Sequence, residues 1–235
     1  IKLPGMLFGA VVRSPFAHAR IRGIDLAPAL RGGEHKTATP AKAIGDLLMA
    51  QGAAALAQIG GAFALCLIDI ARGRVLLAVD RNAVHSLAYT TAGKSLIFST
   101  NQNCINMHPA VLAKIDYQSI YNYVYFHMVP GARTVYEGQS RLGPGQYLEF
   151  VDGKARLGAY WNNSFQEQDS AEFSQLKEQF FHALRSGVRD SAAGAANSGA
   201  FLSGGTDSST VAGLLTEQQG SPAHTYSIGF SAQGY

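Results

Sequence analysis

Seven consecutive residues, Ser203 to Ser209, combine three serines, two glycines, a threonine and an aspartate between two apolar runs. The run 199–202 predicts a short strand, and the run that begins at Ser209 predicts a helix. Two glycines allow a tight turn and a close approach of the backbone to a ligand, while the start of a helix offers free N–H groups and the positive end of its dipole. These residues therefore predict an anion-binding loop, with polyphosphate as its ligand.

The loop lacks the Gly-Lys-Ser/Thr ending of the common P-loop, so no lysine is placed to reach β- and γ-phosphates. Hydroxyls and backbone amides suit a pyrophosphate, with Asp207 helping to hold Mg²⁺, when ATP is cleaved between its α- and β-phosphates. The alternative interpretation is an ordinary strand–turn–helix connection in which Asp207 caps the helix.

The composition is that of a globular protein, with 235 residues, 47% of them hydrophobic and 15% charged. This length suits one large or two modest domains. The 19 basic and 16 acidic residues form no dense basic run, which argues against a nucleic-acid partner. Cys66 and Cys104 have no metal-ligand spacing, so neither a disulfide framework nor a zinc site is expected.

No signal peptide or membrane span is expected, and the interpretation is a cytoplasmic protein. The apolar stretch 52–71 contains Gln58, Asp69 and a Gly-Gly pair. A helix over about 42–57, followed by a buried strand over about 61–70, explains this stretch better than a membrane-spanning helix.

Turn signals separate short β-rich runs along the first two thirds of the chain. A helix over about 116–126 carries tyrosines and a phenylalanine at helical spacing. This aromatic stripe is interpreted as core, and the alternative is a cofactor-binding segment. An amphipathic helix from Ser170 to about Arg189 then leads to a β–α–β unit, whose crossover requires parallel strands. Strands are expected at 62–69, 75–79, 87–91, 96–99, 146–151 and 155–160 in the first part, and near 201 and 225–230 in the second.

The motif SGGTDSS resembles the signature of the ATP-pyrophosphatase amidoligases, and FLSGGTDSSTVAGLL resembles their asparagine synthetase branch. The likeness extends over about residues 42–235, where further segments follow the family's glutaminase domain and the connection to its synthetase domain in order. These segments are 61–69, Asp80-Arg81, 95–100, His108-Pro109, Val129-Pro130, 134–136, 142–145, Tyr160-Trp161 and 224–230.

The resemblance implies an α/β (α+β) fold: a partial glutaminase-type two-sheet sandwich, then the start of a parallel α/β ATP-pyrophosphatase (PP-loop) domain. The implied reaction adenylates a carboxylate, aspartate in the simplest member, releases pyrophosphate and forms an amide with ammonia. ATP and Mg²⁺ are the implied cofactors. Relatives that share the loop include β-lactam synthetases and lasso-peptide cyclases, so the carboxylate substrate stays open. By resemblance, the pyrophosphate is held by Ser203, Gly204, Gly205, Thr206, Asp207 (through Mg²⁺), Ser208 and Ser209, and the adenine is bordered by Phe201, Leu202, Ile228 and Gly229.

The first thirty residues resemble a different family. The runs LPGML and GAVVRSPFAHARI are similar to the hammerhead-like opening of molybdenum hydroxylase large subunits; the alternative is a generic strand pair. The expected organisation is therefore a hammerhead-like segment (1–30), interpreted as a graft, then a junction (31–41), a partial class II glutamine amidotransferase-like domain (42–161) that lacks the N-terminal nucleophile, a linker (162–170) and the beginning of an asparagine synthetase (ATP-binding) domain (171–235).

Glutamine hydrolysis is not expected. The family's glutaminase uses an N-terminal cysteine, whereas this chain begins with Ile1, and neither Cys66 nor Cys104 has a free amine beside it. The segment around Asp80 also departs from the family, with Ala83 in place of glycine. The preferred interpretation is part of an asparagine synthetase-like amidoligase. The alternatives are a non-catalytic remnant with a vestigial nucleotide loop, and part of a molybdenum hydroxylase, which no pterin-binding segment supports.

Overall fold

The computed structural model describes residues 9–10, 40–165, 172–193, 195, 197–229 and 231. The chain divides into two compact units, Ile1–Ser164 and Phe165–Tyr235, which are described separately below. The predicted hammerhead-like segment, the junction and the middle of the predicted linker lie almost wholly outside the described residues, so these assignments stay predictions.

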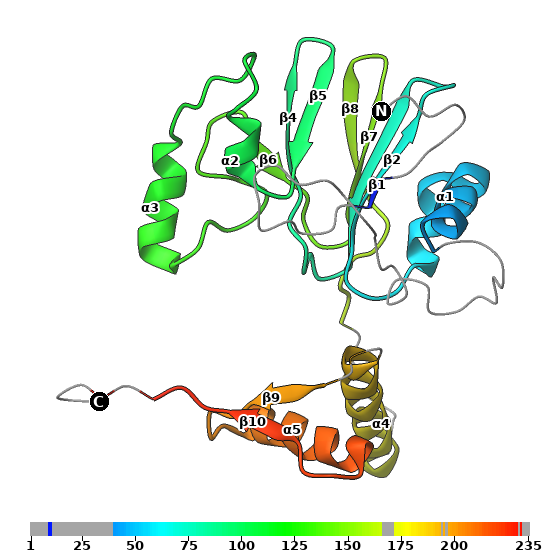
Figure 1. Cartoon of the computed structure of the whole chain (residues 1–235), viewed down its shortest axis with the longest axis vertical. Coiled ribbons are helices and arrows are strands. Elements are labelled where there is room, and N and C mark those ends of the chain that lie inside the picture. Colours follow the sequence, from blue (N-terminus) through cyan, green and yellow to red (C-terminus); the bar gives the residue numbers. More distant parts are fainter. Residues whose placement is uncertain are drawn as a thin grey trace. The chain divides into compact units, whose positions relative to one another are not determined.

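Two antiparallel sheets form the first unit (Figure 1). The larger has the strand order β1-β2-β3-β7-β8, and the smaller has the order β5-β4-β6. The strands are β1 (Gly9–Ala10), β2 (Ala64–Asp69), β3 (Arg74–Val79), β4 (Ala88–Ala92), β5 (Ser95–Ser99), β6 (Ser140–Arg141), β7 (Gln146–Val151) and β8 (Lys154–Ala159).

Alternating side chains of the central strands supply two separate hydrophobic clusters. Cys66 of β2 and Leu77 of β3 face the smaller sheet, while Leu67 and Leu76 face the opposite side. Successive side chains of a strand point to opposite faces, so a strand covered on both faces needs apolar residues at consecutive positions, as β2 and β3 have. The cluster between the sheets contains Ala64, Cys66, Leu77, Val79, Leu87, Leu142, Leu148 and Phe150.

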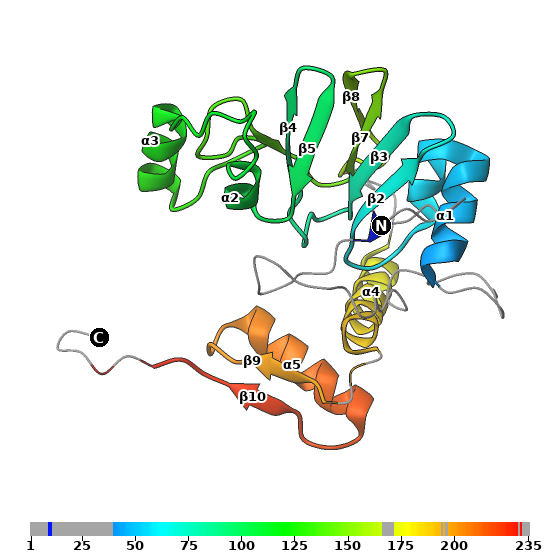
Figure 2. The same cartoon turned by 45° about the horizontal axis from the view of Figure 1, so that its top comes forward.

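A helical layer covers the other face of the larger sheet (Figure 2). It consists of α1 (Pro40–Gln51) and the 3₁₀ helix η2 (Gly52–Gln58), which contribute Leu48 and Leu56 to the second cluster. The predicted single helix over about 42–57 is thus two helices. Gly52, at φ +66°, lies in the left-handed region and ends the α-helix.

The edge of the larger sheet is occupied by β1. Gly9 pairs with Cys66 and Ala10 with Leu65, in antiparallel register. Pairing of this kind occupies backbone N–H and C=O groups of β2 that an open edge would leave free for another chain.

The interpretation of the aromatic stripe at 116–126 as core is wrong. The helix α3 (Tyr117–Phe126) follows the short helix α2 (Gln102–Ile105), and the buried residue of α3 is Ser119. Its four tyrosines and its phenylalanine are all more than half exposed. Helical spacing groups these rings along the element, but contacts from elsewhere in the chain decide whether a face is covered.

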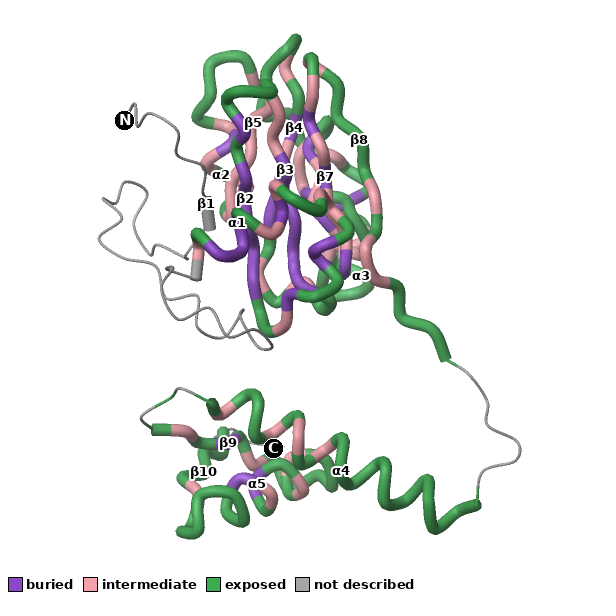
Figure 3. The backbone as a smooth tube through the Cα atoms, turned by 90° about the vertical axis from the view of Figure 1, so that its right-hand side faces the viewer, coloured by how far each residue is buried: buried purple, intermediate pink, exposed green. Residues whose placement is uncertain are grey.

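The second unit is a β–α–β unit preceded by the helix α4 (Phe173–Ala192). The strands β9 (Gly199–Phe201) and β10 (His224–Tyr226) flank α5 (Thr206–Gln219) and pair in parallel, which confirms the predicted crossover. Its buried core is small and consists of Ala200, Ala212 and Leu215. Figure 3 shows the consequence, because the tube of this unit is mostly coloured as exposed.

Asp80 connects three parts of the first unit. Its buried carboxylate accepts hydrogen bonds from the backbone N–H groups of Phe63 (3.1 Å), Asn82 (2.9 Å) and Val84 (3.1 Å). Its own N–H donates to the Phe63 carbonyl (2.9 Å), and its carbonyl accepts from Gly145 N (3.0 Å). The residue thereby joins the entry to β2, the exit from β3 and the turn before β7.

We expect Asp80→Ala to lower the free energy of unfolding of the first unit by about 3 kcal/mol, because a buried N–H loses its charged acceptor. Urea unfolding followed by the fluorescence of Trp161, the single tryptophan of the chain, measures this change. Asp46→Ala is the control, since the exposed ion pair between Asp46 and Lys42 contributes less than about 0.5 kcal/mol. Equal losses in the two variants would contradict the role given to Asp80.

Candidate functional site

The loop between β9 and α5 is shaped by its glycines. Gly204 has φ +86°, a conformation that side chains other than glycine rarely adopt, and a Cβ there would meet no atom within 4 Å. Glycine is therefore required by the backbone conformation and not by crowding. Gly205 is the N-cap of α5, and the helix begins at Thr206.

Hydrogen bonds between residues of the loop stabilise its conformation. The Oγ atoms of Ser203 and Ser208 lie 3.1 Å apart, and Ser208 Oγ also donates to the Gly205 carbonyl (3.1 Å). The backbone N–H of Ser203 donates to the same Ser208 oxygen (3.3 Å). Ser208 therefore connects both ends of the turn, while Thr206, Asp207 and Ser209 are exposed at the start of α5.

The first turn of α5 presents the groups that an anion needs. Its N–H groups have no acceptor one turn earlier in the helix, and the dipole places partial positive charge there. Asp207 is the acidic residue of this turn. An exposed carboxylate beside these amides can offset a cation that accompanies a phosphate.

A magnesium ion fits this arrangement only together with the phosphate groups. Among the residues that the structure describes, no three His, Cys, Asp or Glu side chains come together as a ready-made metal site. Mg²⁺ is commonly held by one or two carboxylates plus substrate phosphates, and Asp207 meets that requirement.

The residues predicted to border adenine do not all share one face. Leu202 packs against the core of the unit formed by Ala200, Ala212 and Leu215, whereas Phe201 is 73% exposed on the opposite face of β9. This separation follows from the alternation of side chains along a strand. Ile228 and Gly229 follow the end of β10 and are both exposed.

Two residues that the sequence interpretation did not single out connect the strand ends. Ser227 Oγ donates to the Leu202 carbonyl (2.6 Å), and Leu202 N donates to the Tyr226 carbonyl (2.8 Å). The rings of Tyr226 and Phe201 meet edge to face with centroids 6.5 Å apart. Ser227 lies inside the strand predicted over 225–230, whereas the observed strand β10 ends at Tyr226 and leaves this hydroxyl just beyond it.

A groove in this unit lies away from the loop. This groove, of about 610 Å³, runs between α4 and α5, and its lining includes Gly187, Val211 and Leu215. Ser198 and Gly199, at the amino end of β9, also line it, whereas the loop follows the carboxyl end of that strand. Since ligands of parallel sheets bind at the carboxyl ends of strands, a nucleotide is expected at the loop and not in this groove.

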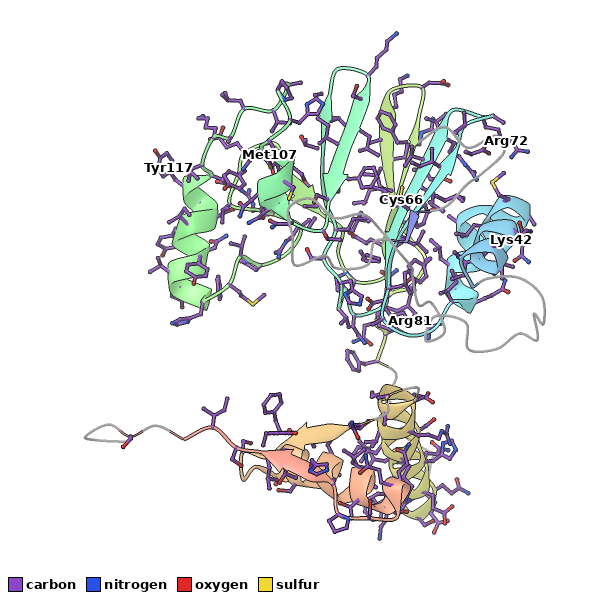
Figure 4. The ribbon with its side chains drawn as sticks, in the orientation of Figure 1. Lys42, Cys66, Arg72, Arg81, Met107 and Tyr117 are labelled. Atoms are coloured by element: carbon purple, nitrogen blue, oxygen red, sulfur yellow. The ribbon has the colours of Figure 1, made fainter. Side chains whose placement is uncertain are left out.

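In the first unit, the buried thiol of Cys66 is a poor nucleophile. This residue, labelled in Figure 4, lies on β2 between the two sheets and is 4% exposed. Burial raises the pKa of its thiol to about 12. A thiolate is the nucleophilic form, so Cys66 is inert at neutral pH. Cys104, on α2, is only partly buried.

We expect one of the two thiols to react quickly with a water-soluble disulfide reagent at pH 8. At that pH a thiol with a pKa of about 12 is ionised in roughly one molecule in ten thousand. Cys104 should account for the rapid phase, and Cys66 should react only after urea unfolds the chain. Labelling of the Cys104→Ser variant is the control. A rapid phase that persists in this variant would show that Cys66 is accessible and reactive.

Both units match known protein families. The glutamine amidotransferase domain model matches residues 21–161, more than half of the chain, and the asparagine synthase model matches residues 179–235. The chain belongs to the asparagine synthetase family. The first match begins at residue 21, inside the segment whose sequence resembles molybdenum hydroxylases.

Individual relatives agree with this assignment. A Methanocaldococcus jannaschii protein, provisionally named asparagine synthetase (glutamine-hydrolysing) 2, is 28% identical over 204 residues, which are 85% of this chain and 40% of that protein. Asparagine synthetase (glutamine-hydrolysing) 3 of Bacillus subtilis is 27% identical over 181 residues, or 74% of this chain and 29% of that protein. The chain thus spans less than half the length of these relatives.

Solved structures give weaker similarity. The glutamine phosphoribosylpyrophosphate amidotransferase of B. subtilis aligns with a TM-score of 0.35 and 16% identity, covering 83% of this chain and 40% of the other. An allosteric regulatory enzyme of purine biosynthesis aligns with a TM-score of 0.37 and 13% identity, covering 87% and 43%. Similarity at this level carries no argument about function.

The predicted family and the mixed α/β fold with antiparallel sheets are confirmed. The assignment of individual residues to pyrophosphate, adenine and magnesium stays a prediction. Within the described ranges, no helix has the length and apolar character needed to cross a membrane.

Proposed function

We propose that this chain contains the nucleotide-binding part of an ATP-dependent amidoligase. In this reaction a carboxylate oxygen of the acceptor attacks the α-phosphorus of ATP, the bond to the β-phosphate breaks, and pyrophosphate leaves. Ammonia then attacks the acyl carbon, and AMP leaves as the amide forms. The observation that carries the proposal is the glycine-shaped loop at the start of α5, which lies within the match to the asparagine synthase model.

The loop residues have distinct proposed roles. The amides of the first turn, with the hydroxyls of Ser203, Thr206 and Ser209, bind the pyrophosphate oxygens. Ser208 keeps the turn folded through its contacts with Ser203 and Gly205. Mg²⁺, when bound beside Asp207, would neutralise charge on the departing pyrophosphate. The contribution of the protein is then positioning and electrostatic stabilisation.

The acceptor is proposed to be aspartate or a related small carboxylate. Three Bacillus subtilis relatives are named asparagine synthetases, and this supports aspartate as the first substrate to test. Phe201 and Ile228 supply exposed apolar surface near the strand ends, suited to the face of an adenine ring.

Cys66 is proposed to take no part in glutamine hydrolysis. Burial and the raised pKa exclude Cys66 as a nucleophile.

A non-catalytic role is the second candidate. The buried core of the second unit consists of three small or medium apolar side chains, and α4 has no buried residue among those described. A unit with so little buried apolar surface has limited stability of its own. A loop that retained its shape but had lost ligand binding would fit this candidate.

We expect Asp207→Ala to weaken binding of Mg²⁺-pyrophosphate at least tenfold, because the loop loses the carboxylate that balances the cation. Isothermal titration calorimetry with pyrophosphate, with and without MgCl₂, measures the change. Glu217→Ala is the matched control, since Glu217 lies at the opposite end of α5 and pairs with Arg185. This control should bind as the parent does.

The two interpretations of Asp207 give different results. If Asp207 only caps the helix, its loss costs about 1 kcal/mol of stability and leaves affinity unchanged. A parent chain that binds neither pyrophosphate nor ATP would favour the non-catalytic candidate.

A further inference from the structure

One peptide group at the entrance to the nucleotide loop is held on both sides by serine hydroxyls. It joins Leu202 to Ser203, where the chain leaves β9. Its carbonyl oxygen accepts a hydrogen bond from Ser227 Oγ (2.6 Å), and its N–H donates to Ser208 Oγ (3.3 Å). The two hydroxyls come from separate elements, because Ser227 follows β10 and Ser208 lies in the first turn of α5.

Ser227 supplies a hydrogen-bond donor at the place where the parallel ladder ends. Leu202 N donates to the Tyr226 carbonyl (2.8 Å), which extends the pairing of β9 and β10 by one bond. If the ladder continued, the Leu202 carbonyl would accept from the backbone N–H of Ile228 on the neighbouring strand. Ile228 lies beyond the end of β10, and the Ser227 hydroxyl donates to this carbonyl.

Ring contacts keep Ser227 in register with Leu202. A Cβ added at Gly199 would lie 2.7 Å from Tyr226 Cε2, so the Tyr226 ring lies close against β9. The same ring meets the ring of Phe201 edge to face. Gly199 and Phe201 are the two ends of β9, which lies beside β10 (Figure 1), and contacts at both ends oppose sliding of one strand along the other. The hydroxyl that follows Tyr226 thereby stays within reach of the Leu202 carbonyl.

The orientation of this peptide group affects what the loop presents to an anion. The group directly precedes Ser203, whose hydroxyl is a proposed pyrophosphate ligand, and Gly204, whose φ is +86°. If the group rotated by half a turn, a carbonyl oxygen would replace the N–H that faces Ser208. Anion-binding loops depend on N–H groups that converge on the ligand, and a carbonyl oxygen among them repels phosphate. The apparent affinity of the loop then falls with the fraction of molecules in the binding orientation.

We propose that Ser227 is a positioning residue for the pyrophosphate loop, whose hydroxyl holds the peptide group between Leu202 and Ser203 in the orientation that binds the anion. The inference rests on the proposed function of the loop and adds to it a residue outside the SGGTDSS motif. Ser227 acts through the backbone and does not itself touch the pyrophosphate. Ser208 holds the same group from the other side, so the two serines share one task.

Isothermal titration calorimetry of the 235-residue chain with Mg²⁺-pyrophosphate tests the consequence for the ligand. Ser227→Ala should weaken binding about fivefold, the effect expected for one net hydrogen bond. Ser227→Thr keeps the hydroxyl, and its affinity should stay within about twofold of the parent value. Ser221→Ala is the matched control, since Ser221 is an exposed serine that precedes β10, and it should bind as the parent does.

Amide hydrogen exchange, followed by NMR without ligand, measures the effect on the peptide group itself. Ser227→Ala should speed exchange of the Ser203 amide about fivefold, because the group can then rotate away from Ser208. Exchange of the Leu215 amide, at a buried position of α5, should not change. General loss of stability would speed both amides, so the two rates separate a local effect from unfolding. If circular dichroism shows that Ser227→Ala does not fold, Ser227→Cys, a weaker donor of similar size, replaces it.

Three results would overturn the proposal. The first is an unchanged exchange rate of the Ser203 amide in Ser227→Ala. The second is an unchanged affinity for Mg²⁺-pyrophosphate in a variant whose exchange is faster, because the orientation of the group would then not matter to the ligand. The third is a Ser227→Thr variant that behaves like Ser227→Ala. A parent chain that binds no pyrophosphate would instead contradict the proposed function, and the exchange rates would still show whether Ser227 holds the peptide group.

Discussion

The arrangement of the first unit depends on one buried carboxylate. Asp80 lies where β3 ends and accepts backbone N–H groups from the entry to β2 and from the loop that leads to β4. A buried carboxylate is stable only when such donors surround it, so the loop must keep this conformation for the sheets to pack. The same region includes Tyr160, whose hydroxyl donates to the Val79 carbonyl (2.8 Å) and whose pKa is raised to about 12 by burial and by the charge of Asp80.

The turn before β7 packs closely against Asp80 and Trp161. Gly145 has φ +65°, its N–H donates to the Asp80 carbonyl, and its carbonyl accepts from Tyr160 N (2.9 Å). A Cβ at this position would lie 2.4 Å from the Trp161 carbonyl oxygen. Backbone conformation and crowding both require glycine here, and β7 thereby enters the sheet beside β3.

The two units distribute apolar surface very differently. In the first unit, both faces of the central strands are covered, and α3 is the main exposed aromatic element. In the second unit, one small cluster lies beneath α5, while Phe201, Tyr226 and Ile228 are exposed near the candidate nucleotide loop. Apolar surface beside a candidate ligand site is the expected place for a planar ring to bind.

The sequence alone determined the features that depend on neighbouring residues. Glycines and hydroxyls between an apolar strand and a helix predicted the loop at 203–209. Alternation with turn residues predicted β2, β3, β4, β5, β7 and β8, but not the two-residue strands β1 and β6. The tertiary structure decided which faces are covered, because this depends on contacts between residues far apart in the chain. The rings of α3 have the spacing of a core helix, yet the helix is fixed through Asp116 and Arg133 and leaves them exposed. Likewise, only the packing of α5 on β9 placed Leu202 against the small core and left Phe201, its neighbour in sequence, exposed on the opposite face.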